Sequence, residues 1–360
     1  MEELVYLNSL RLVQGLGPAK VSQLINYFHG AKQVWHATEQ ELTWFLGRGK
    51  VLESMLFCKK TVDPAAKWDK LIRTGIKATA PGLADYPANL AAIRHPPSIL
   101  YYRGDLSGLD LSLAVVGSRL ATPYGRAVAT SLARELTRGG FMVVSGFARG
   151  IDAAAHRGAL AGGGRTAAVF GSGLDVIYPR EHRALFEEII NSGAVISEFP
   201  LGTEPVPANF PARNRIISGI CLGTLVVEGK EKSGSLITAE FALEQGRDVF
   251  AVPGPVNAQG SRGPHKLLKQ GAKLVEEVED IFEEYAHLVS PPQQVRLAEF
   301  TYPFEYKELL EILSLEPMHL NIICQRLKTA PEKIASLLVH LELAGHIRQL
   351  SGGYYVKNFL

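Results

Sequence analysis

The stretch AVVGSRLATPYG, residues 114–125, decides the fold, because a short apolar run ends abruptly in Gly-Ser-Arg. The β-branched apolar residues predict a buried strand. Thr122 followed by Pro123 is typical of a helix start, where threonine caps the first amides and proline occupies the first helical position. A strand that leads through a glycine turn into a helix is the first half of a βαβ unit.

The same order recurs along the chain. Strands are predicted near residues 112–117, 141–145, 166–170, 194–198, 223–228, 248–252 and 273–276. Amphipathic segments with a helical period separate them, so residues 81–288 predict an α/β domain with an extended, Rossmann-like, doubly wound and mostly parallel sheet. Ligands of such sheets bind beyond the carboxyl ends of the strands, where helix N-termini present unpaired amides.

Three regions flank this sheet domain. Residues 1–80 have the apolar period of helices, and GLGPAKVSQLINYF at 15–28 contains the Gly-x-Gly turn of a helix-hairpin-helix. Residues 289–303 carry Pro and Gln without periodicity, which predicts a linker. Residues 304–360 predict three short helices and a hairpin around 351–353, the order of a winged helix.

The role of the two flanking domains stays open. The Gly-x-Gly turn is explained either by DNA phosphate contact or by a tight turn in a helical packing module. Residues 300–360 contain six basic and six acidic residues, so this region has no excess positive charge that would attract DNA. We therefore favour a protein-contact or regulatory role for the winged helix over base readout.

Composition limits the kinds of protein that this sequence can encode. The 360 residues are 46% hydrophobic with a formal net charge of +2, so bulk charge does not identify a nucleic-acid binder. Three cysteines stand far apart, at 58, 221 and 324, which favours a reducing compartment and no structural zinc. The N-terminus is acidic, and no apolar run has the length of a membrane span. The sequence predicts a cytoplasmic protein without membrane contact.

Glycines, hydroxyls and arginines gather at the predicted strand ends. Phe210 beside two arginines has the composition of a single-strand site, where rings stack on bases and guanidinium groups hold phosphates. Because Phe210 precedes Pro211, we expect an extended backbone there. Asp152 is expected to cap the helix that follows Gly150. The residues predicted to bind phosphate or DNA are Gly117, Ser118, Arg119, Gly146, Arg149, Gly150, Gly171, Phe210, Arg213, Asn214, Arg215, Ser233, Gly234 and Ser235.

Some of these residues also fit structural roles. Phe210 is consistent with a packing residue, and Arg213 and Arg215 with buried ion-pair partners of Glu198 or Glu228. The sequence has no dinucleotide fingerprint, P-loop, nucleophile elbow or zinc-protease motif, so it predicts no cofactor, no metal and no catalytic set. Two further functions stay open: a hydrolase of nucleotide N-glycosidic bonds that uses Glu198 or Glu228, and a winged-helix transcription regulator.

A resemblance covers about residues 80–280. The runs VVGSR, VVSGFARGIDAAAHRGAL, GSGLDVIYPREH, VISEFPLG, FPARNRIISGI and SGSLITAEFALEQGRDVFAVPG, in this order, resemble the DNA processing protein A family, DprA or Smf. The resemblance implies a homodimeric, non-enzymatic binder of single-stranded DNA that protects incoming strands and loads RecA recombinase in natural transformation. It also implies sterile-alpha-motif-like N-terminal helices and a C-terminal winged helix.

The resemblance also assigns residues by position. It implies that 117–119 form a phosphate loop and that Phe210, Arg213 and Asn214 line the pocket. Arg180 in YPREH stands where the family usually has lysine, so the positive charge is kept. Arg180 therefore joins the predicted DNA-binding residues.

Overall fold

The computed structural model describes residues 2–289, 304–314, 317–343 and 346–357. The chain forms two compact units, Met1–Val289 and Ser290–Leu360. Apart from Val289, the predicted linker lies outside the described residues. Within the described ranges, no helix is long and apolar enough to cross a membrane.

The first unit begins with a group of helices, as predicted. These are α1 (Glu2–Leu10), α2 (Pro18–Phe28), α3 (Ala31–His36), α4 (Glu39–Leu46), α5 (Lys50–Thr61) and α6 (Pro64–Arg73). The predicted Gly-x-Gly turn leads into α2: Gly15 has φ +78°, which favours glycine, and Gly17 is the N-cap. The helices pack against the sheet domain, where the Tyr101 hydroxyl donates to Asn8 Oδ1 at 2.9 Å in the buried core.

A nine-stranded sheet follows. Its strands are β1 (Lys77–Thr79), β2 (Leu100–Gly104), β3 (Ser112–Val116), β4 (Met142–Ser145), β5 (Thr166–Val169), β6 (Ala194–Ser197), β7 (Gly223–Val226), β8 (Asp248–Ala251) and β9 (Lys273–Leu274). The parallel strands β3 to β9 fall where the sequence predicts them. The antiparallel strands β1 and β2, at one side of the sheet, were not predicted, because they are not part of a βαβ unit.

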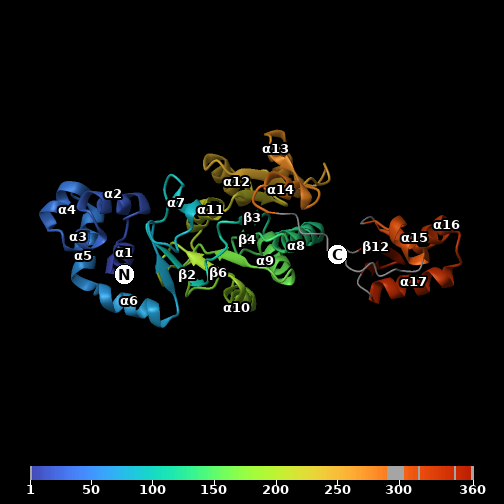
Figure 1. Cartoon of the computed structure of the whole chain (residues 1–360), viewed down its shortest axis with the longest axis horizontal. Coiled ribbons are helices and arrows are strands. Elements are labelled where there is room, and N and C mark those ends of the chain that lie inside the picture. Colours follow the sequence, from blue (N-terminus) through green and yellow to red (C-terminus); the bar gives the residue numbers. More distant parts are fainter. Residues whose placement is uncertain (1, 290–303, 315–316, 344–345, 358–360) are drawn as a thin grey trace. The chain divides into compact units, whose positions relative to one another are not determined.

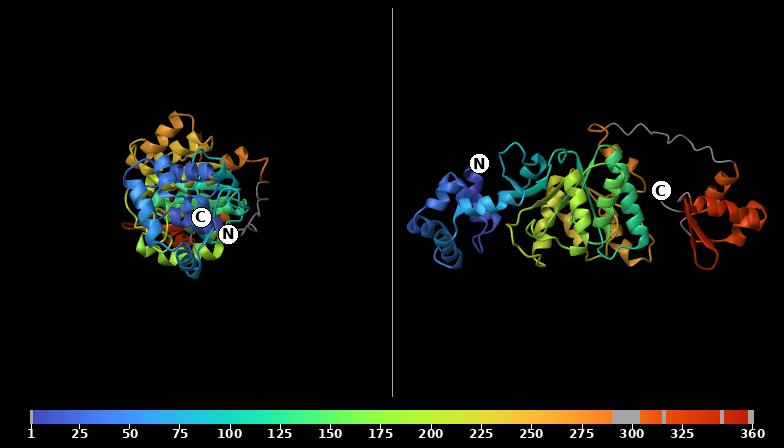
Figure 2. Two further views of the ribbon diagram at one scale, coloured as in Figure 1. Left: turned by 90° about the vertical axis from the view of Figure 1, so that its left-hand side faces the viewer. Right: turned by 90° about the horizontal axis from the view of Figure 1, so that it is seen from below.

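Helices cover both faces of the sheet (Figures 1 and 2). On one face lie α7 (Ala88–Ala91), α11 (Asn209–Ile220), α12 (Gly234–Glu244) and α13 (Arg262–Lys269). On the other lie α8 (Pro123–Arg138), α9 (Ile151–Ala161), α10 (Arg183–Ser192) and α14 (Glu279–Glu284). Every residue of β3 is buried, and its side chains alternate between the two apolar layers. This confirms the predicted α/β fold class.

The strand order places a switch point beside β3. The order is β1-β2-β6-β5-β4-β3-β7-β8-β9, so the chain builds outward from β3 in one direction and then returns to β7 on its other side. Val115 of β3 pairs with Leu225 of β7. At such a point, the loops after the two neighbouring strands diverge and leave a crevice at the carboxyl edge.

The second unit has the elements of a winged helix, as predicted. It contains α15 (Phe304–Ile312), β10 (Met318–His319), α16 (Leu320–Leu327), α17 (Pro331–Leu343), β11 (Ile347–Leu350) and β12 (Tyr354–Lys357). The predicted hairpin joins β11 to β12, and Gly352 and Gly353 supply the positive φ angles of its turn. The short strand β10 completes the sheet and was not predicted.

Candidate nucleic-acid interface

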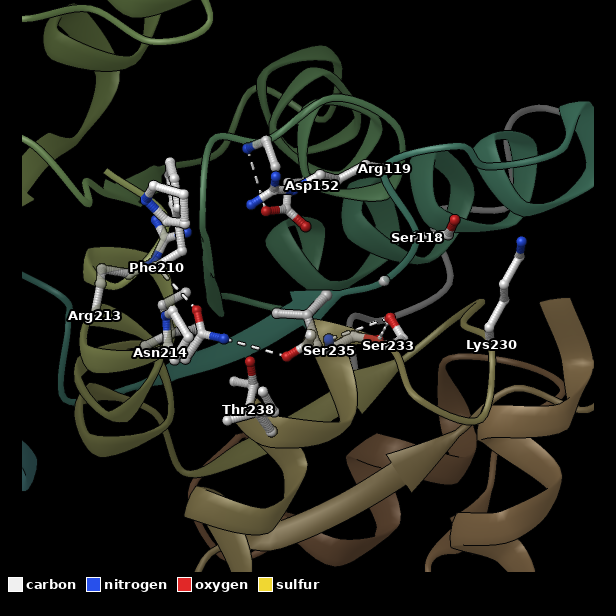
Figure 3. Close-up of a pocket in the computed structure, with 18 of the residues that line it drawn as sticks. Ser118, Arg119, Asp152, Phe210, Arg213, Asn214, Lys230, Ser233, Ser235 and Thr238 are labelled. Carbon is white, nitrogen blue, oxygen red and sulfur yellow. Dashed lines mark hydrogen bonds between the residues drawn. The ribbon is translucent and has the colours of Figure 1, made fainter. Parts of the chain in front are cut away.

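A cavity of about 590 Å³ opens at the switch point, beyond β3 and β7. Five segments line it: the loop after β3, the start of α9, the loop at Tyr178, the beginning of α11, and the loop that leads into α12. Figure 3 shows side chains from the loop after β3, from α9, from α11 and from the start of α12 around one opening. The lining residues are Val116, Gly117, Ser118, Arg119, Leu120, Ala148, Asp152, Tyr178, Pro205, Pro207, Phe210, Pro211, Arg213, Asn214, Ile217, Lys230, Lys232, Ser233, Gly234, Ser235, Ile237 and Thr238.

The loop after β3 is held in place by its backbone. A Cβ at Gly117 would lie 2.5 Å from Ile151 Cγ1 and 2.7 Å from the Glu228 carbonyl oxygen, so glycine is required there. The Ser118 amide donates to the same carbonyl at 2.6 Å. Arg119 is exposed and extends from this fixed loop. Its guanidinium lies over the Phe210 ring at the cavity and is accessible to a ligand.

Phe210 lies in the first turn of α11 and is half-buried. The Arg119 guanidinium carbon lies 4.8 Å from the centre of the Phe210 ring, and the Tyr178 ring centre lies 5.9 Å away. The predicted extended backbone is wrong, because Pro211 occupies the first helical turn, where its missing N–H leaves no intrahelical bond unmade. A Cβ at Gly171 would lie 3.0 Å from the Phe210 ring, so Gly171 leaves room for this ring.

Helix α12 presents its N-terminus to the cavity. Ser233 is the N-cap and its hydroxyl accepts from the Ser235 amide at 3.3 Å. A Cβ at Gly234 would meet nothing within 4 Å, so the approach to the first turn is open. Asn214 ties α11 to this turn, donating to the Gly234 carbonyl at 3.2 Å. The helix dipole and the serine hydroxyls suit a phosphate oxygen.

Arg213 braces the wall of the cavity. Its side chain is only 3% exposed and donates to the carbonyl oxygens of Gly146, at 2.7 Å, and Val169. Burial lowers the pKa of Arg213 to about 10, opposed by the Asp152 carboxylate. The sequence predicted that Arg213 holds a phosphate. The structure does not support this role, because the guanidinium already donates hydrogen bonds to backbone carbonyl oxygens of the protein.

Asp152 is the one carboxylate that lines the cavity in the described part of the chain. Burial raises the pKa of Asp152, while the nearby Arg213 and the Ala148 amide, at 3.2 Å, act in the opposite direction. The predicted capping role is wrong: Gly150 is the N-cap of α9, and no side-chain bond caps that helix. Asp152 instead holds the loop before α9 against Arg213.

Two lysines and a tyrosine of the cavity were not predicted. Lys230 and Lys232 are exposed in the loop between β7 and α12, and Tyr178 is 42% exposed. In the sequence, Lys230 and Lys232 alternate with glutamates, the pattern of a solvated turn. Among the described residues, neither lysine nor Arg119 forms an ion pair. In the sequence, the signal that could have identified the two lysines as site residues is their position just before the Ser-Gly-Ser helix start.

Comparisons with known proteins agree with this architecture. The family model described as DNA recombination-mediator protein A matches residues 77–286, and that of the DprA winged helix domain matches residues 303–353. The chain is 42% identical over 283 residues to Protein Smf of Escherichia coli strain K12, which covers 75% of this chain and 74% of that protein. The chain belongs to the DNA processing protein A (DprA/Smf) family.

Solved structures and a second relative extend the comparison. DprA of Streptococcus pneumoniae strain R6 is 46% identical over 205 residues, 56% of this chain and 71% of that protein. The X-ray structure of S. pneumoniae DprA superposes with a TM-score of 0.70 at 36% identity, covering 78% of this chain and 97% of that one. DprA of Helicobacter pylori, whose structure is described as revealing a single-stranded DNA binding mode, gives 0.53 at 30% identity, covering 59% and 96%.

The structure brings nine of the predicted site residues together around the cavity at the switch point. These are Gly117, Ser118, Arg119, Phe210, Arg213, Asn214, Ser233, Gly234 and Ser235. Six predicted residues do not line it. These are Gly146, Arg149, Gly150, Gly171, Arg180 and Arg215.

The residues outside the cavity have other partners. Arg149 is exposed and pairs with Glu181 at 2.5 Å. Gly150 has φ +78°, and a Cβ there would overlap the backbone of Ser118, so Gly150 supports the loop that carries Arg119. Arg180 is exposed in the short 3-10 helix η1 (Arg180–His182).

Arg215 takes the structural role that the sequence left open. Its guanidinium donates to Glu198 Oε2 at 2.5 Å and to the His95 carbonyl at 2.7 Å. The two charged side chains are 16% and 4% exposed, respectively. Glu228, in turn, accepts the Thr122 amide at 2.9 Å and fixes the start of α8. The alternative function, a hydrolase of nucleotide N-glycosidic bonds, would use Glu198 or Glu228, and neither residue lines the cavity.

Proposed function

We propose that this chain binds single-stranded DNA in the cavity at the switch point, with the phosphate backbone beside Arg119 and the helix α12 N-terminus. The observation that carries the proposal is the Arg119–Phe210 contact, where an exposed guanidinium lies 4.8 Å from a half-buried ring. A base stacks on a ring while an adjacent cation holds its phosphate, which is how sequence-tolerant single-strand sites work.

The charges of the cavity support a polyanionic ligand. Arg119, Lys230 and Lys232 are exposed, and the α12 N-terminus adds a positive dipole end. The lining carboxylate, Asp152, is buried against Arg213, and burial raises its pKa. Little negative charge therefore faces a bound phosphate.

The test compares binding to single-stranded and double-stranded oligonucleotides of the same mixed sequence by fluorescence anisotropy. We expect tighter binding to the single strand, because the bases of a duplex stack on one another and their faces are not available to Phe210. Equal affinity for both forms would contradict the single-strand assignment. A marked preference for one duplex sequence would instead favour a regulator that reads base edges.

Binding is expected to weaken steeply with salt. If Arg119, Lys230 and Lys232 each neutralise one phosphate, the log–log slope of affinity against salt should be about −2, since each contact contributes about −0.7 on a single strand. Arg119→Ala should make the slope less steep by about 0.7. Titrations at four salt concentrations measure both values. An affinity independent of salt would rule out a backbone site.

Phe210→Leu is expected to weaken single-strand binding by about 1–3 kcal/mol, the scale of base stacking on an aromatic ring. Leucine keeps much of the apolar contact with Tyr178 and Gly171, so the melting temperature should change little. Affinity and melting are measured on the same preparation. A lower melting temperature with unchanged affinity per folded molecule would make Phe210 a packing residue only.

We further propose the wider role that membership of the DprA family suggests. In this proposal the chain acts as a cytoplasmic homodimer, protects incoming single strands and loads RecA recombinase onto them, without catalysing a reaction itself. The test follows RecA-dependent ATP hydrolysis on strands covered with single-strand binding protein, with and without this chain. Faster onset of hydrolysis supports loading, and an unchanged lag contradicts it.

A further inference from the structure

A pair of stacked aromatic rings lies exposed on the N-terminal helices, outside the cavity described above. Tyr27 of α2 and Trp44 of α4 have ring centres 5.3 Å apart with 27° between their planes. Both helices belong to the helical group at the N-terminal end of the chain (Figure 1), and the two rings lie near the C-terminal ends of these helices. Tyr27 is 48% and Trp44 73% exposed. Large aromatic side chains are usually well buried, so a stacked pair left in solvent indicates a binding surface.

The rings behind this pair give it a fixed position. Phe45 lies partly buried behind Tyr27, with ring centres 5.2 Å apart, and Phe28 packs against both. These contacts join the pair to the apolar core of the helical group. The outer ring, Trp44, therefore offers an aromatic face whose support is already ordered.

Three exposed cations lie near the ring pair in the sequence, at positions 20, 48 and 50. Lys20 lies seven residues before Tyr27, two helical turns away on the same face of α2, and α2 contains no acidic residue. Arg48 and Lys50 follow α4 directly and are exposed. Across the described ranges, none of these three cations forms an ion pair.

Helix α4 has two glutamates in its first turn, Glu39 and Glu41, and Glu41 is engaged in the helix cap. Glu41 accepts from the Thr38 amide and the Thr38 hydroxyl, both at 2.7 Å, which closes a capping box. These hydrogen bonds lower the pKa of Glu41 and keep its charge at the helix start. A ligand at this surface meets the stacked rings of Tyr27 and Trp44, and exposed cations that form no ion pair within the described ranges.

We propose that Lys20, Tyr27, Trp44, Arg48 and Lys50 form a second contact surface for single-stranded DNA, here called the N-terminal aromatic surface. Its bases would stack on Trp44 and its phosphates lie beside the cations, since a single strand offers both an aromatic face and negative charge. An apolar protein partner would satisfy the rings and leave the cations unpaired. The N-terminal aromatic surface goes beyond the cavity at the switch point, and neither site requires the other.

The test uses the full chain, the oligonucleotide dT20, and an abasic strand of the same length. Trp44→Leu is expected to weaken dT20 binding about tenfold, within the range of base stacking on one ring, and to leave abasic-strand binding unchanged. Phe57→Leu is the matched control, because Phe57 is 66% exposed on α5 but outside the ring pair. Addition of dT20 should also quench the indole emission that Trp44→Leu removes.

Each outcome bears on the proposal. Unchanged dT20 affinity for Trp44→Leu would overturn it, and so would an equal loss on dT20 and the abasic strand. A change in molecular mass by light scattering, with dT20 affinity intact, would make the surface a protein contact and overturn it. The measurements are repeated in the Arg119→Ala background. A Trp44 effect that persists there supports the N-terminal aromatic surface even if the cavity at the switch point fails its own test.

Discussion

Arg215→Ala is expected to lower the free energy of unfolding by about 3–5 kcal/mol, because it leaves the buried Glu198 carboxylate without its partner. The Glu198 side chain is 4% exposed, and its contact with Arg215 is a 2.5 Å hydrogen-bonded ion pair. The same substitution also removes the donor to the His95 carbonyl. Single-strand affinity per folded molecule should stay unchanged, because Arg215 does not line the cavity. Denaturant unfolding and anisotropy on one preparation measure both quantities.

The control for Arg215 removes both charges. The double variant Arg215→Met, Glu198→Gln should recover much of the lost stability, because an uncompensated buried charge is the main source of the penalty. A loss of DNA affinity in Arg215→Ala that exceeds its unfolded fraction would contradict the structural role of Arg215.

Arg119→Ala should give the opposite pattern. We expect a loss of about 1.5–3 kcal/mol in single-strand binding, the scale of a hydrogen bond to a charged group, without loss of stability. Arg119 is exposed, forms no ion pair in the part of the chain that the structure describes, and lies over Phe210. Anisotropy titration with a mixed-sequence single strand measures the loss.

Arg138→Ala is the matched control for Arg119→Ala. Arg138 is an exposed arginine in the last turn of α8 and does not line the cavity. It removes the same charge from the protein, so it corrects for general electrostatic attraction. Equal losses in the two variants would mean that Arg119 contributes charge rather than a specific contact.

The elements of the parallel sheet could be predicted from the sequence because their signals are local. Strand length, β-branched composition and the Thr-Pro helix start occur within a few residues of each element. The strand order that creates the switch point was not predicted, because β3 pairs with β7, which comes from a distant part of the sequence. The antiparallel strands β1 and β2 have no such local order. β1 pairs with β2, and β2 pairs with β6, which is far away in the sequence.

The different roles of Arg213 and Arg215 could not be predicted from an extended backbone at Phe210, because these roles depend on the helical geometry of α11. On a helix, Phe210, Arg213 and Asn214 are three and four residues apart and share a face, which is the face at the cavity. Arg215 is two residues from Arg213 and points to another side, where it meets Glu198. With Pro211 in the first turn of a helix, the helical period places Arg213 and Arg215 on different sides of α11.

The remaining differences between the predicted and the observed site arise from the burial of side chains, which the sequence does not show. An arginine in a sequence motif looks the same whether it is 3% exposed, as Arg213 is, or exposed, as Arg119 is. The carbonyl oxygens that engage Arg213 belong to residues 146 and 169, which no spacing rule connects to it. Tyr178 likewise reaches the cavity only through its folded loop.

The central claim is that a single strand lies in the cavity with a base against Phe210. Photo-crosslinking tests it most directly, using a mixed-sequence oligonucleotide that carries 5-iodouracil, followed by mass spectrometry of the crosslinked peptides. The account predicts a crosslink at Phe210 or Tyr178 that Arg119→Ala weakens and Arg138→Ala does not. Crosslinks confined to residues 1–80 or 304–357, with none at either aromatic residue of the cavity, would contradict it.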